Sequence, residues 1–177
     1  SADVVHKSDA KGVVFCAKRY DAVKREIDRL IELHRGRGAH VDGVLVVEFV
    51  ERGGQGLGEE LFVGIRATRE FGPVIAAGLG GVDTEYLARV MQPGVAVAKA
   101  VATESTAEGF FELFRQTAAY QMISGQVRGH RRIVSDGELI RCFRAFIALA
   151  RRFCVDRGEI GPDVAELEVN PFAFRRQ

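Results

Sequence analysis

The sequence predicts an α+β fold in which two glycine-rich turns face a late strand that carries acidic side chains. The first observation behind this prediction is the order of elements: strand, helix, strand, glycine-rich turn, two strands, two helices and a last strand. The second is a pair of glycine-rich stretches, ERGGQGLGEE at residues 51–60 and GLGG at residues 78–81. The third is the segment VAELEVNPFAF at residues 164–174, in which oxygen-bearing and apolar side chains alternate.

The composition indicates a globular chain with no electrostatic preference for polyanions. Its 177 residues are 47% hydrophobic and carry a net charge of +1, which suits one domain or two closely joined lobes. This balance predicts neither nucleic acid nor a membrane surface as a partner. The sequence shows no signal peptide and no apolar run near the ~20 residues of a membrane helix, so we expect a cytoplasmic location. Cys16, Cys142 and Cys154 form no C-x-x-C pair, which favours free, buried thiols over a disulfide.

The first part of the chain predicts a helix between two strands. GVVFCAK at residues 12–18 is a short run with β propensity, and VDGVLVVEFV at residues 41–50 is typical of a buried strand. The helix is DAVKREIDRLIELHRG at residues 21–36, and Gly36 favours its end there. One helical face carries Val23, Ile27, Leu30, Ile31 and His34. Because strand-like sequence begins almost at once, we expect the first element of the fold to be absent from this chain.

The rest of the chain predicts two more strands and two helices before the last strand. The strands are LFVGIRA at residues 61–67 and FGPVIAAGLGG at residues 71–81. Each helix begins at the pattern of a capping box, Ser105 with Glu108 and Ser135 with Glu138. The predicted core consists of apolar side chains at helical spacing: Phe110, Phe111, Phe114 and Ala118 on the first helix, and Leu139, Phe143, Phe146, Ile147, Ala150 and Phe153 on the second.

The last strand is the first candidate for chemistry. Side chains alternate across a strand, so Glu166, Glu168 and Asn170 share one face, while the residues between them face the core. Carboxylate and amide oxygens suit Mg²⁺, which usually takes one or two protein ligands and the rest from phosphates and water. Pro171 lacks an amide hydrogen, so it suits the edge of a sheet or the end of a strand, and we expect the strand to stop after its oxygen-bearing side chains. The alternative is an edge strand whose acidic face is simply solvated.

The glycine-rich turns are the second candidate. Gly53, Gly54, Gly56 and Gly58 would let the backbone approach a ligand and offer bare amides to phosphate oxygens. The pattern is not a Walker A loop, since no Gly-Lys-Ser/Thr follows, and a strand rather than a helix comes next, unlike a dinucleotide fingerprint. A plain flexible hairpin explains the loop equally well. The same alternatives apply to GLGG.

The segment VVHKSD is the third candidate. Its histidine, His6, stands beside a cation and a short acid that could orient one ring nitrogen. A histidine can act as a general base or accept a phosphoryl group, although a solvated surface histidine has the same local sequence. The remaining histidines, His34, His40 and His130, have no metal-binding spacing.

Taken together, VVHKSDAKGVVF, GVLVVEFVERGGQGLGEELFVGI, FGPVIAAGLGG and ELEVNPFAF resemble the ATP-grasp domain of the NDP-forming acyl-CoA synthetases. This group includes the ADP-forming acetate–CoA ligases and the succinyl-CoA synthetase β subunits. The resemblance implies an ATP-grasp fold with a nucleotide cleft between two α/β lobes. Residues 1–50 would form part of the small lobe, without its first strand, and residues 51–177 the large lobe.

The resemblance also implies an activity. A carboxylic acid, coenzyme A and ATP would give acyl-CoA, ADP and phosphate through acyl phosphate and phosphohistidine, with ATP and Mg²⁺ bound by this domain. Coenzyme A and the acid would be handled by domains of the same polypeptide or of a partner subunit. Nothing in the sequence selects the acid.

Individual residues take roles from the same resemblance. His6 matches the histidine that receives the phosphoryl group, and Asn170 matches a Mg²⁺ ligand with Glu166 and Glu168 as acidic positions beside it. The residues that would contact the nucleotide are Glu48, Phe49, Val50, Gly53, Gly54, Gly56, Glu60, Gly78, Gly80 and Gly81.

Departures from the family pattern keep two alternatives open. A lysine-bearing strand before HKSD and an aspartate-bearing strand after ELEVNP are not in this sequence. The segment at residues 85–109 replaces one that usually holds an aspartate and a Phe-Arg pair, with Lys99 as a candidate substitute. The alternatives are a non-catalytic ATP-grasp module that regulates or binds partners, and an ATP-grasp ligase that does not use coenzyme A.

Overall fold

The computed structural model describes residues 12–49, 58, 60–81, 89–92, 94–156, 158 and 161–174. The chain divides into two compact units, Ser1–Phe49 and Val50–Gln177. The first unit contains helix α1, and the described part of the second contains a four-stranded sheet and the helices α3, α4 and α5. Within these described ranges, none of the helices combines the length and apolar character that a bilayer-spanning segment requires.

Helix α1, Tyr20–Arg35, follows the predicted helix closely. Leu30 is buried on the predicted apolar face, and the backbone N–H of Gly36 donates to the Glu32 carbonyl at 2.9 Å where the helix ends. An ion pair between Lys24 and Asp28, one turn apart, lies at 2.7 Å on the exposed side. The helical periodicity of this segment is therefore confirmed.

The two strands predicted on either side of α1 are wrong for the residues that the structure describes. Neither residues 12–18 nor residues 41–49 are strands. The side chains of Leu45, Val46 and Val47 are 85%, 60% and 72% exposed. The β propensity of these runs is real, but a strand also needs a neighbouring backbone to hydrogen-bond with and an apolar surface to cover its face.

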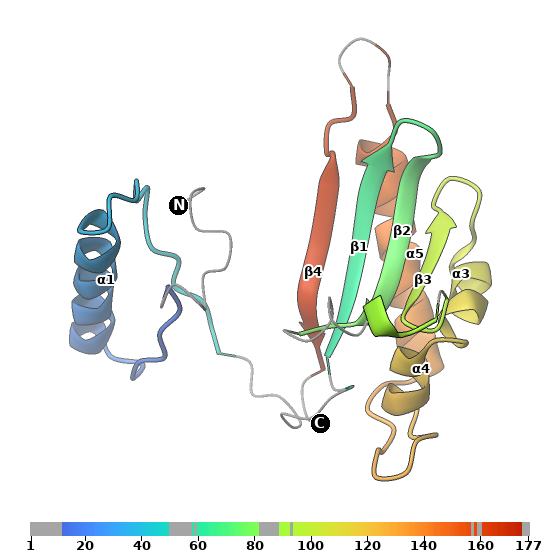
Figure 1. Cartoon of the computed structure of the whole chain (residues 1–177), viewed down its shortest axis with the longest axis horizontal. Helices are drawn as coiled ribbons and strands as arrows, with labels where there is room; N and C mark the ends of the chain where they lie inside the picture. Colours follow the sequence, from blue (N-terminus) through green and yellow to red (C-terminus); the bar gives the residue numbers. More distant parts are fainter. Residues whose placement is uncertain are drawn as a thin grey trace. The chain divides into compact units, whose positions relative to one another are not determined.

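The sheet of the second unit is antiparallel throughout, in the order β3-β2-β1-β4. Its strands are β1 (Glu60–Thr68), β2 (Gly72–Leu79), β3 (Val97–Val101) and β4 (Glu166–Ala173). The last strand of the chain thus pairs with the first strand of the sheet, as Figure 1 shows. The predicted strands at residues 61–67, 71–81 and the acidic segment are confirmed.

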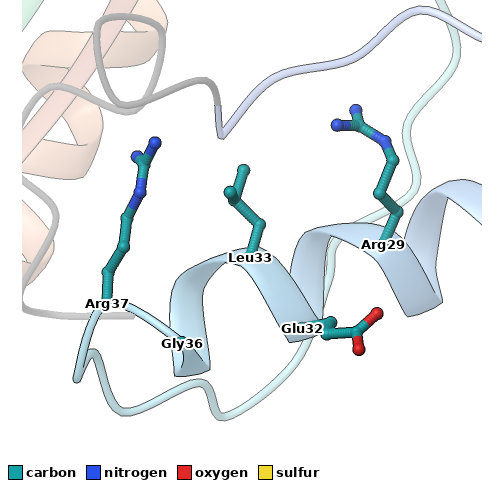
Figure 2. Close-up of a pocket in the computed structure, with 5 residues that line it drawn as sticks. All are labelled: Arg29, Glu32, Leu33, Gly36 and Arg37. Atoms are coloured by element: carbon teal, nitrogen blue, oxygen red, sulfur yellow. The ribbon is translucent and has the colours of Figure 1, made fainter.

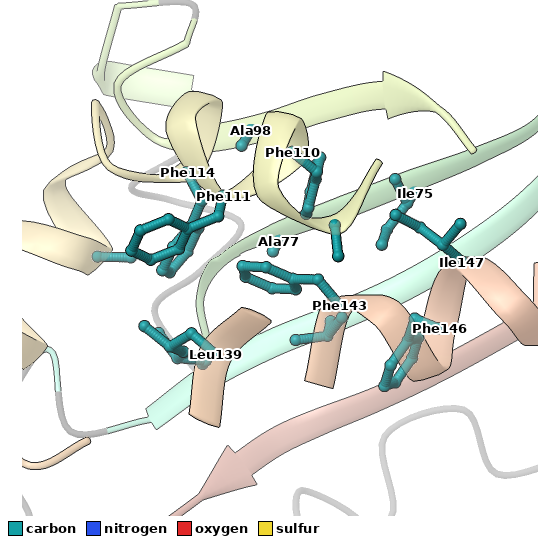
Figure 3. Packing of buried hydrophobic residues seen from close by; sticks show 14 of the residues in the cluster. Ile75, Ala77, Ala98, Phe110, Phe111, Phe114, Leu139, Phe143, Phe146 and Ile147 are labelled. Atoms are coloured by element: carbon teal, nitrogen blue, oxygen red, sulfur yellow. The ribbon is translucent and has the colours of Figure 1, made fainter. Parts of the chain in front are cut away.

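Three helices cover one face of this sheet: α3 (Ala107–Phe114), α4 (Ala118–Ile123) and α5 (Asp136–Phe153). Figure 3 shows aromatic side chains of α3 and α5 packed together above β2. The rings of Phe110 and Phe143 meet edge to face with centroids 4.9 Å apart, and both side chains are fully buried. Each strand contributes alternate residues to this core, such as Leu61, Val63 and Ile65 of β1.

The structure confirms one predicted helix start and corrects the other, together with the place of Ala118. The capping box of Ser135 and Glu138 is confirmed, with both reciprocal hydrogen bonds present. At α3, however, Thr106 is the capping residue, since its Oγ1 accepts from the Gly109 N–H at 3.0 Å, whereas the Ser105 hydroxyl donates back to the Val101 carbonyl. Ala118 starts α4 instead of ending α3.

The other face of the sheet carries a different set of side chains. In chain order these are Phe62, Gly64 and Arg66 from β1, Val74, Ala76 and Gly78 from β2, Val97, Lys99 and Val101 from β3, and Glu166, Glu168 and Asn170 from β4. We call this surface the open face, because α3, α4 and α5 pack on the opposite side. Gly64 and Ala76 are small residues in its middle, Lys99 lies on one edge strand, and Glu166 and Glu168 lie on the other.

Candidate functional site

One end of the sheet brings together segments that are distant in the sequence. Neighbouring strands run in opposite directions, so β1 begins where β2 and β4 end and where β3 begins. Glu60, Gly81 and Asn170 lie at this end, and we call these three residues the candidate site. Two of the three predicted segments, the GLGG turn and the acidic strand, are therefore adjacent.

Asn170 connects these two segments directly. The backbone N–H of Gly81 donates to its Oδ1 at 3.1 Å, across 89 positions of sequence. The Asn170 side chain is exposed and does not enter the apolar core. An amide oxygen has two lone pairs, so the bond to Gly81 leaves acceptor capacity for a second partner.

Glu60 lies on the other side of the same glycine. Gly81 has φ +94, and a Cβ built there would stand 2.9 Å from Oε2 of Glu60. The backbone N–H of Gly80 also donates to the Glu60 carbonyl at 2.8 Å. A carboxylate and an amide oxygen thus flank one bare backbone, which is possible because Gly81 has no side chain.

Close packing alone requires glycine at positions 78 and 80. A Cβ at Gly78 would be 2.6 Å from the Ala96 carbonyl oxygen and 2.9 Å from the ring of Phe62. A Cβ at Gly80 would collide with the backbone of Leu61. Glycine is therefore required at both positions whether or not a ligand binds, and their contact with phosphate stays a prediction.

The acidic strand has the predicted alternation but does not end where expected. Leu167 packs against the core while Glu166, Glu168 and Asn170 are exposed. The strand continues to Ala173, so the expected stop at Pro171 is wrong, whereas the expected place of Pro171 on an edge strand is confirmed. Among the described strands, β4 pairs with β1 alone. The register between them shifts between Leu61 and Val63, and an edge strand with such an irregularity can hold Pro171, which has no amide hydrogen to donate.

The spacing along β4 limits how these oxygens could share an ion. Four residues separate Glu166 from Asn170, roughly 13 Å at about 3.3 Å per residue, whereas two ligands of one Mg²⁺ lie within about 4 Å. Glu166 instead lies opposite Arg66 in the pairing with β1. Glu168, two residues from Asn170, is the better placed of the two acids. In the part of the chain that the structure describes, no three His, Cys, Asp or Glu side chains converge.

The residues present fit a magnesium ion that takes few ligands from protein. The Asn170 oxygen has a lone pair to spare, Glu60 lies across Gly81 from it, and Glu168 stands two residues before it on β4. Such a donor set suits an ion that completes its shell with phosphate oxygens and water.

Two cations on the open face complete its charge pattern. Lys99, Ala76, Gly64 and Glu168 form one row across the four strands, with a cation at one edge and a carboxylate at the other. Arg66 lies on the same face and was not among the predicted site residues. The alternation of Phe62, Gly64 and Arg66 along the strand was the signal that could have identified it.

Several predicted residues lie elsewhere. His6, Val50, Gly53, Gly54 and Gly56 fall outside the described residues. Glu48 and Phe49 belong to the first unit and lie in a segment that is neither helix nor strand, where the ring of Phe49 contacts Phe15 at 5.1 Å.

The thiols and the pocket on α1 carry no chemistry that we can assign. All three cysteines are free as predicted, but Cys16 is exposed and not buried, and burial raises the pKa of Cys142 to about 11. The pocket is lined by Arg29, Glu32, Leu33, Gly36 and Arg37, all of one helix or its end, and none is a predicted site residue. Figure 2 shows both arginines and Leu33 projecting from one side of α1.

Comparisons with known proteins agree with this architecture. Residues 1–177 match a protein family described as ATP-grasp domain. The chain is 30% identical to acetate–CoA ligase [ADP-forming] I of Archaeoglobus fulgidus over 172 residues, which is 97% of this chain and 22% of that protein. It is 27% identical to acetate–CoA ligase [ADP-forming] I subunit beta of Pyrococcus furiosus, over 98% of this chain and 66% of that subunit.

A solved structure shows the same fold. The dinucleotide-forming acetyl-coenzyme A synthetase 1 of Ca. Korarchaeum cryptofilum, in complex with coenzyme A, Ca-AMPCP and HgCl⁺, matches with a TM-score of 0.69 and 28% identity. The match covers 99% of this chain and 67% of that one. The predicted ATP-grasp fold is confirmed, and the chain spans only a part of the relatives that it matches.

Proposed function

Because this chain belongs to the ATP-grasp domain family, we propose that it is the ATP-binding and phosphoryl-transferring domain of an NDP-forming acyl-CoA synthetase. Its relatives are ADP-forming acetate–CoA ligases. The observation that carries the proposal is the hydrogen bond from Gly81 to Asn170, which joins the GLGG turn to the acidic strand beside Glu60. In this proposal residues 1–50 form part of the small lobe and residues 51–177 the large lobe.

The open face would receive the triphosphate. Its middle holds no large side chain at Gly64 and Ala76, and the exposed Lys99 would supply a positive charge for phosphate oxygens. Asn170 and Glu168 would hold Mg²⁺, with Glu60 beside them. When bound, this ion would neutralise the charge that develops on the phosphates.

The proposed chemistry is transfer of the γ-phosphoryl group to His6. An unprotonated imidazole nitrogen of His6 forms the new N–P bond while the bond between the γ-phosphorus and the bridging oxygen breaks, and ADP leaves with that electron pair. The contribution of the sheet is positioning and charge neutralisation, because phosphoryl transfer needs little covalent help from protein.

Coenzyme A and the carboxylic acid would be handled outside this chain. One relative is described as a subunit beta, and this chain covers 22% of another. We propose that partner domains, in the same polypeptide or in another subunit, form the acyl phosphate and the thioester.

Isotope labelling tests this function. The complete protein should form acid-labile phosphohistidine from γ-³²P-labelled ATP in the presence of magnesium, and His6→Ala should abolish the label. Calorimetry should show magnesium-dependent nucleotide binding in both proteins, because His6 accepts the group and does not hold the nucleotide. Binding without any label in the parent protein would support the non-catalytic ATP-grasp module. Labelling without thioester formation from a panel of acids would support a ligase that does not use coenzyme A.

A further inference from the structure

The loop that follows α4 is held in one shape by its backbone. Its ends are joined by an isolated antiparallel bridge between Ser124 and Arg132, and the Ile133 N–H donates to the Ile123 carbonyl at 3.0 Å. Gly125 has φ +77, and a Cβ there would be 2.8 Å from the backbone nitrogen of Arg132. We call residues 124–133 the basic loop. Its base is tightly packed, so the direction of its tip is fixed.

The tip of the basic loop carries positive charge that is not neutralised locally. The sequence contains no Asp or Glu between Glu112 and Asp136. Arg132 is tied to Asp136 by a hydrogen bond of 2.8 Å. Arg128 and Arg131 are exposed, and neither makes a hydrogen bond or ion pair with any other residue that the structure describes.

The basic loop lies at the same end of the sheet as the candidate site. The side chain of Met122, at the end of α4, packs against Gly58. A Cβ added at Gly58 would be 2.5 Å from the Met122 Sδ. Gly58 stands two residues before Glu60 of the candidate site. The start of α4 is fixed near the same end, since the Ala118 N–H donates to the Val95 carbonyl at 2.9 Å. Figure 1 shows α4 and the loop after it beyond the end where β1 begins.

We propose that the basic loop docks an acidic polypeptide surface, that of the coenzyme A-handling part which the proposed function requires. This inference rests on the proposed function, because that function needs a second protein surface to approach this end of the sheet. Charge complementarity supports it, because the guanidiniums of Arg128 and Arg131 are exposed on a turn whose base is held by backbone bonds, and such groups pair with carboxylates.

The shape of the loop favours a protein surface over a small anion or RNA. Gly129, at the tip between Arg128 and Arg131, has φ +88 and open space where a Cβ would lie. A protruding turn does not enclose a small ligand, whose sites are concave. The loop contains no Phe, Tyr or Trp on which bases could stack, and the whole chain has a net charge of only +1.

Hydrogen–deuterium exchange tests the proposal without relying on turnover. The comparison is made within the complete protein, which contains the coenzyme A-handling part, between the parent and the variant Arg128→Glu with Arg131→Glu. Amides of the basic loop should exchange about tenfold more slowly in the parent at about 0.1 M salt, and the difference should shrink at about 1 M salt. Arg128→Glu with Arg131→Glu should remove the protection. Arg69→Glu, an exposed arginine in the turn between β1 and β2 at the opposite end of the sheet, should not.

The outcomes separate this proposal from the proposed function. Equal exchange of the loop in the parent and in the double variant overturns the docking surface, even if acyl-CoA is formed. A protected loop in a protein that forms no acyl-CoA keeps the docking surface and overturns the ligase. Loss of nucleotide binding in the double variant, by calorimetry, would place the loop in the nucleotide site and overturn docking. Protection of the loop by a single-stranded oligoribonucleotide, but not by the coenzyme A-handling part, overturns it as well.

Discussion

The side-chain oxygen of Asn170 accepts a hydrogen bond from the backbone N–H of Gly81 at 3.1 Å and so fixes the end of β4 against the turn after β2. Asn170→Ala should therefore have two effects. The free energy of unfolding should fall by about 1 kcal/mol, the usual net value of such a bond, and magnesium-dependent nucleotide affinity should fall about tenfold because an oxygen ligand is lost. Chemical unfolding and calorimetry measure the two. Unchanged nucleotide affinity would remove Asn170 from the metal site while leaving its structural role.

Gly81 should tolerate a side chain less well than a glycine with a similar backbone. Gly81→Ala combines a left-handed residue, which costs roughly 1–2 kcal/mol, with a contact against the Glu60 carboxylate. Gly72 also has a positive φ, of +70, but has open space around its Cβ, so Gly72→Ala measures the backbone cost alone.

The difference between the free energies of unfolding of Gly81→Ala and Gly72→Ala measures the contact with Glu60. Adding Glu60→Ala should reduce the cost of Gly81→Ala toward that of Gly72→Ala, and a thermal-unfolding double-mutant cycle measures this coupling. Additive effects of Glu60→Ala and Gly81→Ala would show that the two residues do not interact.

Lys99 should matter for the nucleotide and not for the fold. It is exposed in the middle of β3 and lies in one row with Glu168. Lys99→Gln should weaken ATP binding about tenfold, since one positive charge near the phosphates is lost, with the unfolding midpoint unchanged. Arg69→Gln removes an equal charge from the other end of the sheet and should bind ATP like the parent. Equal affinities for both variants would exclude Lys99 from phosphate binding.

Asp136 should make stability depend on pH in acid. The hydrogen bond from Arg132 holds the pKa of the Asp136 carboxyl below its usual value. A carboxyl with a lowered folded-state pKa stabilises the fold above its unfolded pKa, near 3.9, and loses that contribution as the pH falls through the folded pKa. Asp136→Asn should thus lower the unfolding temperature at about pH 7 and have little effect at about pH 2.

The matched variant for this comparison is Asp163→Asn, an exposed carboxyl in the loop before β4. It should leave the unfolding temperature nearly unchanged at both pH values. If the unfolding temperatures of Asp136→Asn and the parent protein differ by the same amount at both pH values, the pair with Arg132 does not depend on the charge of Asp136.

The sequence alone was sufficient wherever structure follows from neighbours along the chain. The alternation of Glu166, Leu167 and Glu168 predicted a half-buried strand, and the apolar stripe of α5 with the capping box of Ser135 predicted a buried helix. These features repeat with the period of the element itself, so a short window contains the whole signal.

Tertiary structure decided everything that depends on which segments become neighbours. Residues 41–49 have the pattern of a strand but no strand partner among the described residues, and Gly78 is required by a carbonyl and a ring that only the folded sheet brings near it. The meeting of Asn170 with Gly81 depends on the strand order, which places the last strand beside the first. Local periodicity specifies which face a side chain takes, whereas strand order determines which backbone groups it meets.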